Sequence, residues 1–336
     1  MKIALFEVSS SEEKEYFQSQ LKDHELFFFD EILDPENLPD QKDFEAISIF
    51  VNSKMDAAVI DSFPNLKMIA TRTTGFDNVD SAAAKSKNIA VCNVPAYGSH
   101  TVAEFTFGLI LSLMRKVYLG ANRVKVASDF NLEGLRGEDL FQKTLGVIGT
   151  GKIGTNVIKI AQGFEMKVLA YDPKPKNELS NQLHFSYVPL EELLKNSDIV
   201  TLHVPLLPDT KHLINRQNIL TMKKGSFLIN TSRGPVLETE AIFQAITSGH
   251  LAGAALDVLE EEGETKEEIA EIYQRNMPPG EAKRILENHL LAGLPQVIIT
   301  PHMAFYSKEA EHSIWQTTVA NIKSVIEGNP ENLVNG

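Results

Sequence analysis

Short apolar runs alternate with polar or amphipathic segments along the whole chain. Five runs precede residue 100, at residues 2–8, 25–29, 45–51, 67–73 and 88–94. Others follow, at residues 145–148, 198–203, 226–230, 251–255 and 296–300. Continuous apolar runs of this length suit strands that are buried on both faces. The pattern therefore predicts an α/β chain with two doubly wound parallel sheets.

The long helical segments indicate how the two sheets are connected. Residues 99–128 contain no proline and predict one long helix or a kinked pair, and residues 308–328 predict a final helix. Because the first sheet lacks a closing element, we expect the final helix to return to it. The expected domains are residues 1–99 with 301–336, and an inserted domain of residues 100–300.

A glycine-rich turn follows the apolar run at residues 145–148. Its sequence is Gly149, Thr150, Gly151, Lys152, Ile153 and Gly154. The glycines permit a tight turn, close approach of the backbone to a pyrophosphate, and close packing of the next helix. Asp172 ends the following predicted strand, where a carboxylate can bind a ribose 2′-hydroxyl and would repel a 2′-phosphate. The unit therefore predicts a dinucleotide site that prefers NAD over NADP.

Composition limits the compartment and the partners. The single cysteine, Cys92, excludes an internal disulfide and a cysteine-cluster metal site, so we expect no metal. The first fifteen residues become acidic too early for a signal peptide, and no apolar stretch is long enough for a membrane span. A formal net charge of −13 argues against nucleic acid or an anionic membrane as a partner. We expect a cytoplasmic protein.

Three further motifs resemble the D-2-hydroxyacid dehydrogenase family, most nearly its lactate-type members. They are Asn230-Thr-Ser-Arg-Gly234, Ala255-Leu-Asp-Val-Leu-Glu-Glu-Glu262 and Thr300-Pro-His-Met-Ala-Phe-Tyr306. Residues 74–78 and 94–97 extend the resemblance over nearly the whole chain. It implies a Rossmann-type NAD domain inserted into a flavodoxin-like substrate domain, in a homodimer. It also implies reversible reduction of a small 2-oxo acid to a 2-hydroxy acid, here pyruvate to D-lactate.

The resemblance gives catalytic roles to Arg233, Glu262 and His302. Arg233 binds the substrate carboxylate, which a planar guanidinium can grip with two parallel hydrogen bonds. His302 exchanges a proton with the substrate oxygen, and Glu262 orients the imidazole ring. Because Glu260 and Glu261 directly precede Glu262, either could be the partner of His302 if the loop is shifted.

The resemblance also implies which residues surround the two ligands. Besides the glycine turn and Asp172, those expected at the dinucleotide are His203, Val204, Pro205, Thr231, Ser232, Arg233 and Asp257. Those expected at the substrate are Thr74, Gly75, Tyr97 and Phe305, together with Arg233 and His302. Asp257 is expected near the nicotinamide, and the five-residue spacing from it selects Glu262.

Other functions stay open at this point. The Met-Ala-Phe-Tyr run after His302 favours a small apolar 2-oxo acid, but Asn52 stands where lactate-type members often have a tyrosine. A broader D-2-hydroxyacid reductase or a hydroxypyruvate/glyoxylate reductase is therefore an alternative. A dinucleotide-sensing protein like the C-terminal-binding corepressors would share the fold without turnover. Residues 263–294 form a charged segment, expected to be helical near 267–274 and 280–291, whose function the sequence does not indicate.

Overall fold

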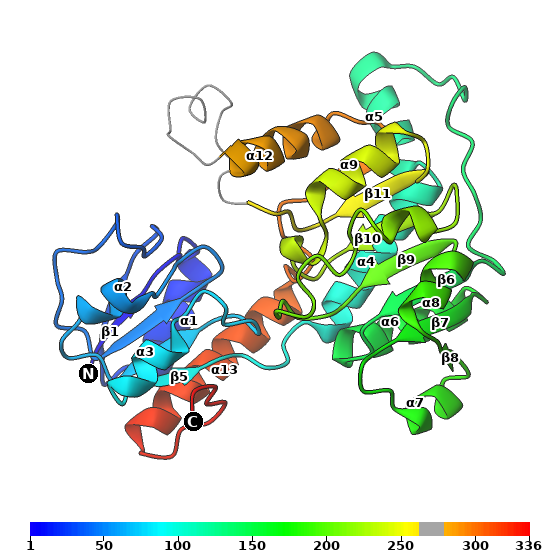
Figure 1. Cartoon of the computed structure of the whole chain (residues 1–336). Coiled ribbons are helices and arrows are strands. Elements are labelled where there is room, and N and C mark those ends of the chain that lie inside the picture. The colour runs from blue at the N-terminus through cyan, green and yellow to red at the C-terminus, as the bar shows by residue number, and fades with distance from the viewer. Residues whose placement is uncertain (262–278) are drawn as a thin grey trace. The chain divides into compact units, whose positions relative to one another are not determined.

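A computed structural model describes residues 1–261 and 279–336, and these fall into two compact units (Figure 1). Unit 1 comprises Met1–Tyr97 and Tyr306–Gly336, and unit 2 comprises Gly98–Phe305. Each unit has a sheet whose described strands all run parallel, with helices between them. The predicted α/β class with two parallel sheets is confirmed. The helix predicted near residues 267–274 lies outside the described residues.

Unit 1 has, within its described residues, a five-stranded sheet of order β2-β1-β3-β4-β5. Its strands are β1 (Lys2–Leu5), β2 (Glu25–Phe28), β3 (Ala46–Ile49), β4 (Met68–Thr71) and β5 (Ala90–Cys92). Its helices are α1 (Ser11–Gln20), α2 (Ala57–Asp61), α3 (Ser81–Ser86) and α13 (Lys308–Ile326). The sequence begins each helix with a side chain that accepts a backbone N–H of the first turn. These caps are Ser10, Asp56, Asp80 and Ser307.

The two faces of the unit 1 sheet are covered by different helices. Phe44, Ile47 and Ile69 belong to a core that includes residues of α2 and α3, whereas α13 packs against β4 and α1. Cys92 is fully buried at the end of β5. Burial raises the pKa of its thiol to about 11, so the side chain is an uncharged packing group at neutral pH.

Unit 2 has, in its described part, a seven-stranded sheet of order β12-β11-β10-β9-β6-β7-β8. Its strands are β6 (Thr144–Ile148), β7 (Lys167–Tyr171), β8 (Ser186–Tyr187), β9 (Ile199–Leu202), β10 (Phe227–Asn230), β11 (Gly253–Leu256) and β12 (Val297–Ile299). Its α-helices are α4 (Ser99–Met114), α5 (Val117–Ala127), α6 (Lys152–Gly163), α7 (Asn177–Gln182), α8 (Leu190–Asn196), α9 (Thr239–Thr247) and α12 (Pro279–Ala292). Two 3₁₀ turns, η1 (Ile219–Thr221) and η2 (Gly234–Val236), complete the described elements.

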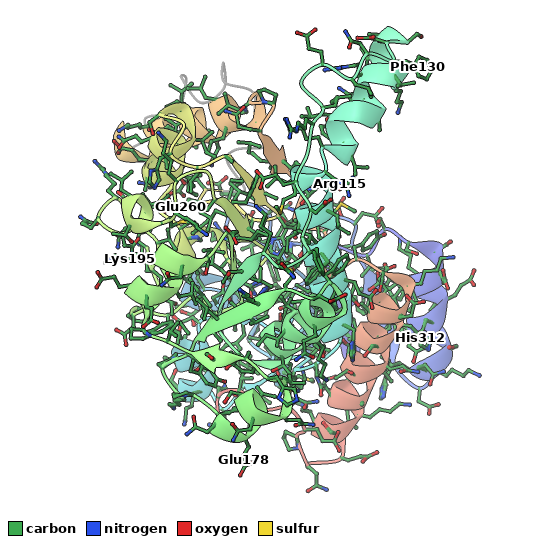
Figure 2. The ribbon with its side chains drawn as sticks, turned by 90° about the vertical axis from the view of Figure 1, so that its right-hand side faces the viewer. Arg115, Phe130, Glu178, Lys195, Glu260 and His312 are labelled. Atoms are coloured by element: carbon green, nitrogen blue, oxygen red, sulfur yellow. The ribbon has the colours of Figure 1, made fainter. Side chains whose placement is uncertain are left out.

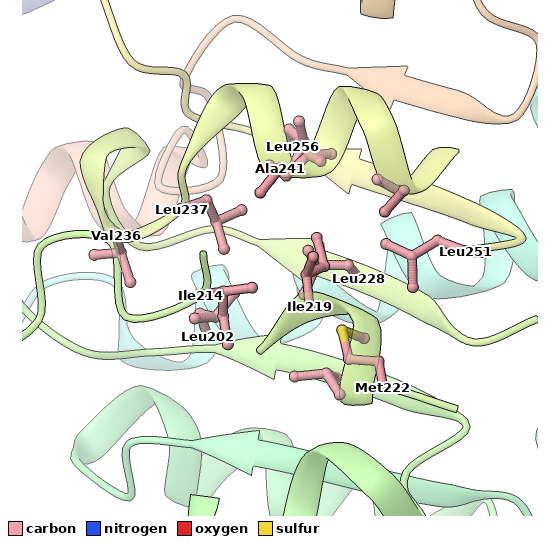
Figure 3. Close-up of a cluster of buried hydrophobic side chains, with 14 of the residues drawn as sticks. Leu202, Ile214, Ile219, Met222, Leu228, Val236, Leu237, Ala241, Leu251 and Leu256 are labelled. Atoms are coloured by element: carbon pink, nitrogen blue, oxygen red, sulfur yellow. The ribbon is translucent and has the colours of Figure 1, made fainter. Parts of the chain in front are cut away.

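Two apolar cores hold the unit 2 sheet, one on each face. Figure 3 shows Ile219, Leu228 and Leu251 among the side chains packed between the strands and α9. On the other face, Phe107 of α4 and Val157 of α6 belong to the second core. Burying a large apolar side chain stabilises a fold by roughly 1.5–3 kcal/mol. The strands are therefore held rigidly, and their ends are fixed points from which loops begin.

The segment predicted as one long helix or a kinked pair is a pair. α4 ends at Met114 and α5 begins at Val117, because Lys116 adopts a left-handed conformation with φ of 54°. α5 has no buried residue, and it extends away from the sheet of unit 2 with Phe130 beyond its far end (Figure 2). No helix within residues 1–261 or 279–336 is both long and apolar enough to cross a membrane.

Candidate active site

Six strands of unit 2 end in one transverse row. The register aligns their last residues, which are Tyr171, Ile148, Leu202, Asn230, Leu256 and Ile299. Open parallel sheets bind ligands beyond the carboxyl ends of their strands. The residues that follow the row are Asp172, Gly149, His203, Thr231, Asp257 and Thr300. The sheet therefore brings the unit 2 residues predicted from the sequence to a single edge.

The glycine turn has the geometry that a pyrophosphate needs. Gly149 has φ of 94°, and a Cβ there would meet the His203 carbonyl oxygen at 2.6 Å. A Cβ on Gly154 would overlap the Gly149 carbonyl oxygen, whereas one on Gly151 would meet nothing within 4 Å. Gly151 is the N-cap of α6, and no side chain caps that helix. Open space in front of uncapped N–H groups at a helix N-terminus fits a phosphate anion.

Asp172 is held beside this turn by three hydrogen bonds. Thr150 donates to its Oδ2 from the backbone N at 2.8 Å and from Oγ1 at 2.9 Å, and the Lys174 backbone N donates to Oδ1 at 2.9 Å. Partial burial raises the pKa of Asp172, but these hydrogen bonds and the charge of Lys176 together hold it below its usual value. The carboxylate is therefore charged and fixed at neutral pH.

His203 supplies a buried polar atom that has no partner within the described residues. Its Nε2 lies 3.0 Å from Thr201 Oγ1, whereas its Nδ1 is buried and makes no hydrogen bond. Burial lowers the pKa of His203 to about 3, so the ring is neutral at physiological pH. An unpaired nitrogen between the ends of β6 and β10 is a contact that a bound dinucleotide could complete. Val204, the next residue, is buried against Gly149.

Arg233 leaves the end of β10 through a turn organised by Asn230. The Asn230 Oδ1 accepts the Ser232 backbone N–H at 2.9 Å, and its Nδ2 donates to the Arg233 carbonyl oxygen at 2.9 Å. The Thr231 hydroxyl is buried 3.0 Å from that of Thr106 on α4. The sequence motif included Asn230 but gave it no role in this turn, although an asparagine that ends a buried run is a known signal for one.

His302 lies on a loop that Asp257 anchors. The buried Asp257 carboxylate accepts the Met303 and Ala304 backbone N–H groups at 3.0 and 2.8 Å and the Thr300 hydroxyl at 2.5 Å. The Asp257 carbonyl oxygen accepts the His302 backbone N–H at 2.9 Å. Burial raises the pKa of Asp257 above its usual value, although these hydrogen bonds lower it in part.

The anchored loop fixes how His302 is presented. His302 itself has φ of 53°, a left-handed conformation that costs a non-glycine residue free energy unless its surroundings impose it. Its ring lies edge-on to that of Phe305, with centroids 6.3 Å apart. Two residues predicted at the substrate, His302 and Phe305, are thus neighbours in unit 2.

Two of the three consecutive glutamates, Glu260 and Glu261, lie within the described residues. Glu262, the predicted partner of His302, lies outside the described residues. Glu260 is buried and bonded to His212 and Thr239, and Glu261 accepts from Nε of Arg284 at 2.9 Å. Each described alternative therefore binds side chains other than His302. Among the described residues, no three His, Cys, Asp or Glu side chains gather as a metal site would require.

The remaining predicted substrate residues belong to unit 1. Thr74 and Gly75 follow β4, and Tyr97 is the half-buried end of the first segment of that unit. The Thr74 hydroxyl donates to the Val94 carbonyl oxygen at 2.8 Å, and Asn93 Nδ2 donates to the Thr74 carbonyl oxygen at 2.7 Å. These bonds tie the loop after β4 to the loop after β5.

Comparison with known proteins gives consistent matches. The model of the family described as D-isomer specific 2-hydroxyacid dehydrogenase, NAD binding domain, matches residues 107–304. A 2-hydroxyacid dehydrogenase homolog of Zymomonas mobilis is 39% identical, covering 91% of this chain and 90% of that protein. An aromatic 2-oxoacid reductase of Clostridium sporogenes is 40% identical, covering 84% and 83%. The structure of D-lactate dehydrogenase from Aquifex aeolicus complexed with NAD and lactic acid has a TM-score of 0.85 and 36% identity, covering 97% and 96%.

Proposed function

The chain belongs to the D-isomer-specific 2-hydroxyacid dehydrogenase family, and we propose that it is a D-lactate dehydrogenase that interconverts pyruvate and D-lactate. It is an NAD-dependent oxidoreductase that acts on the CH–OH group of 2-hydroxy acids. The observation that supports the proposed chemistry is the order of adjacent strand ends. Arg233 follows β10, Asp257 follows β11 and His302 follows β12, on the same sheet edge as the glycine turn.

In the proposed reaction, each residue has one task at the substrate. Arg233 binds the carboxylate of the 2-oxo acid, which fixes the position of the adjacent carbonyl group. Bound NADH supplies a hydride to the carbonyl carbon. His302 gives a proton to the carbonyl oxygen, and Glu262 orients the His302 ring. The loop that Asp257 anchors keeps the imidazole in place. In the reverse direction, neutral His302 takes the hydroxyl proton of the 2-hydroxy acid.

The remaining assignments are proposals that follow the family pattern. Residues 100–300 form the proposed NAD-binding domain, in keeping with the family match at residues 107–304. Residues 1–99 and 301–336 form the proposed substrate domain, in which Thr74, Gly75 and Tyr97 contact the substrate. A reducing compartment such as the cytoplasm suits a chain whose one cysteine is buried.

We propose a homodimer, because α5 and the residues directly after it expose apolar side chains that a single chain leaves uncovered. The exposed fractions are 56% for Tyr118, 76% for Val126 and 79% for Phe130. An isolated helix of 11 residues is marginal in water, so α5 needs packing partners. Large exposed apolar side chains on one protruding segment favour an interaction site there. We choose a second copy of the chain as the partner, because it is present wherever the protein is made.

The deciding experiment is reduction of pyruvate with NADH, followed by chiral analysis of the product. D-lactate is the expected product, because one geometry of carboxylate, proton donor and hydride donor yields one enantiomer. Arg233→Lys should raise KM and lower kcat together, since an ammonium cannot reproduce the two-point grip. L-lactate, or rapid turnover of hydroxypyruvate or glyoxylate without turnover of pyruvate, would reject the assignment.

Reduction of larger, aromatic 2-oxo acids is the second candidate function. It is favoured by the 40% identity to an aromatic 2-oxoacid reductase and by Asn52, a small side chain where lactate-type members often have a tyrosine. The Asn52 side chain and backbone both donate to the Glu7 carboxylate, at 2.9 and 3.0 Å. A panel that contains pyruvate, 4-methyl-2-oxopentanoate and phenylpyruvate separates the two candidates through the ratios of kcat/KM.

A further inference from the structure

Glu260 is a buried carboxylate whose two oxygens both accept hydrogen bonds. It is 6% exposed. Oε1 lies 2.7 Å from His212 Nε2, and Oε2 accepts the backbone N–H and the hydroxyl of Thr239, each at 2.8 Å. Burying an ionised carboxylate is costly unless partners of this kind compensate for lost hydration. The site is therefore built to hold this one side chain in place.

The partners of Glu260 come from elements that are far apart in the chain. Thr239 is the first residue of α9, so the carboxylate lies at the N-terminus of that helix. His212 lies on the connection between β9 and β10. The Glu260 carbonyl oxygen accepts Asn288 Nδ2 of α12 at 2.7 Å. The residue labelled Glu260 in Figure 2 therefore joins the end of β11 to two helices and a loop.

The same connections reach the turn that carries Arg233. The His212 backbone N–H donates to the Pro235 carbonyl oxygen at 2.8 Å, two residues after Arg233. Gly234 lies directly against the backbone ahead of Glu260, since a Cβ at Gly234 would overlap the Leu259 carbonyl oxygen and lie 2.6 Å from the Glu260 N. The position of residues 259–260 and that of the Arg233–Gly234 turn are thus mutually dependent.

We propose that Glu260 is a positioning residue of the active site, clamped by His212 and Thr239. It fixes the backbone at residues 259–261 against Gly234. The turn that carries Arg233 is thereby kept in one position. This inference rests on the proposed roles of Arg233 and Glu262. It assigns Glu260 a task different from theirs, because Glu260 acts through the backbone and not on the substrate.

The first test is Glu260→Gln in the full-length protein, assayed with pyruvate and NADH. The amide keeps the size of the side chain. Its NH₂ group would face either His212 or Thr239, both of which donate hydrogen bonds to the carboxylate in the wild type. The clamp loosens, and kcat/KM for pyruvate should fall about 10- to 100-fold, since a displacement near 1 Å can cost about 100-fold. Kd for NADH should change less than about twofold, because the glycine turn and Asp172 follow β6 and β7, away from Glu260 in the sheet order.

Two variants of His212 test whether its hydrogen bond to Glu260 is needed. His212→Gln keeps an N–H donor for Oε1 of Glu260 and should retain most of the activity. His212→Leu leaves Oε1 without that donor and should reproduce much of the loss seen in Glu260→Gln. Glu240→Gln is the control for the same substitution on α9. Its carboxylate pairs with Arg216 and Lys283, whose own side chains are about half exposed, and not with His212 or Thr239, so this variant should lose much less activity than Glu260→Gln.

The pH dependence separates positioning from proton transfer. In Glu260→Gln the midpoint of the pH profile for pyruvate reduction should not move, whereas Glu262→Gln should move it. An equal shift in both variants would make Glu260 a partner of His302 and overturn the proposal. Wild-type kinetics in Glu260→Gln, or equal losses in His212→Gln and His212→Leu, would also overturn it. If Glu260→Gln does not fold, the two His212 variants still decide. Failure of the proposed function is distinguishable, because the wild-type enzyme itself would then not reduce pyruvate to D-lactate.

Discussion

The Asp257 carboxylate accepts the backbone N–H of Ala304 at 2.8 Å, two residues beyond His302. The same carboxylate accepts the N–H of Met303 at 3.0 Å. A strand end in the buried sheet thus specifies the backbone path of a loop on the next strand. These bonds fix the loop directly after His302, whose left-handed conformation costs free energy in a residue other than glycine.

Asp257→Asn should lower kcat about 10- to 100-fold by loosening this loop. The amide would place an NH₂ group against one of two backbone N–H donors and leave it without an acceptor. Thr300→Val, which removes only the hydroxyl donor, should have a smaller effect. Steady-state kinetics with pyruvate, with melting temperatures as a control for folding, provide the measurement. An Asp257→Asn enzyme with normal kcat would show that the loop does not need the carboxylate.

Asp172 should make the enzyme strongly prefer NADH over NADPH. A 2′-phosphate would meet a carboxylate that hydrogen bonds hold charged and in place. The quantity to measure is kcat/KM for each cofactor, in the wild type and in Asp172→Ser, which should relax the preference. Equal values in the wild type would mean that Lys174 or Lys176 neutralises the repulsion.

His302→Ala should lower kcat by roughly 10²- to 10⁴-fold, the usual contribution of a positioned acid or base. Since reduction needs protonated His302 and oxidation needs the neutral ring, the two directions should show opposite pH trends in the wild type. Glu262→Gln should move the reduction profile towards lower pH, because a carboxylate partner stabilises an imidazolium. A fully active His302→Ala enzyme would exclude this residue as the proton donor.

His203 should make the protein without cofactor less stable as the pH falls below about 6.5. Burial lowers its pKa in the folded state from 6.5 to about 3, so only the unfolded state gains a proton in that range. Stability from the neutral ring is complete above pH 6.5 and decreases by up to about 1.4 kcal/mol per pH unit below it. His203→Gln should flatten this dependence in urea titrations at pH 7 and 5.5. His184→Gln, at an exposed histidine, should leave it unchanged.

Charged substitutions on α5 and the residues after it should dissociate the proposed homodimer. Val126→Glu with Phe130→Glu places two charges on the exposed apolar surface and makes its burial unfavourable. Light scattering coupled to size-exclusion chromatography should show a dimer for the wild type and a monomer for the variant. Lys125→Glu, a charge change at an exposed polar position of the same helix, should dissociate the dimer less. A wild-type monomer would refute the dimer itself.

Local sequence patterns predicted the strands and the strand ends well, because buried parallel strands are continuous apolar runs. Gly149 directly follows such a run, and Asp172 was predicted at the end of the next strand. The break between α4 and α5 was not located. Met114 at the end of α4 accepts the Glu138 backbone N–H at 2.9 Å. A contact across 24 residues leaves no local signal.

The three consecutive glutamates show the same limit at the candidate site. Glu260 and Glu261 are identical in chemistry and adjacent in sequence, yet one is bonded to His212 and the other to Arg284. Their partners lie 48 and 23 residues away. Spacing from Asp257 could select Glu262 as a hypothesis, but only the packing of α9 and α12 shows what the other two bind.

Cys92 gives the chain an unusual practical property. Because its thiol is buried and protonated at neutral pH, thiol-directed dyes should not react with it in the native protein. Any cysteine introduced at an exposed position would then be the only reactive one, without prior removal of a native residue. One dye on α3 and another on α7 would therefore report the separation of the two units, and its change on addition of NADH and pyruvate, by energy transfer in an otherwise unaltered enzyme.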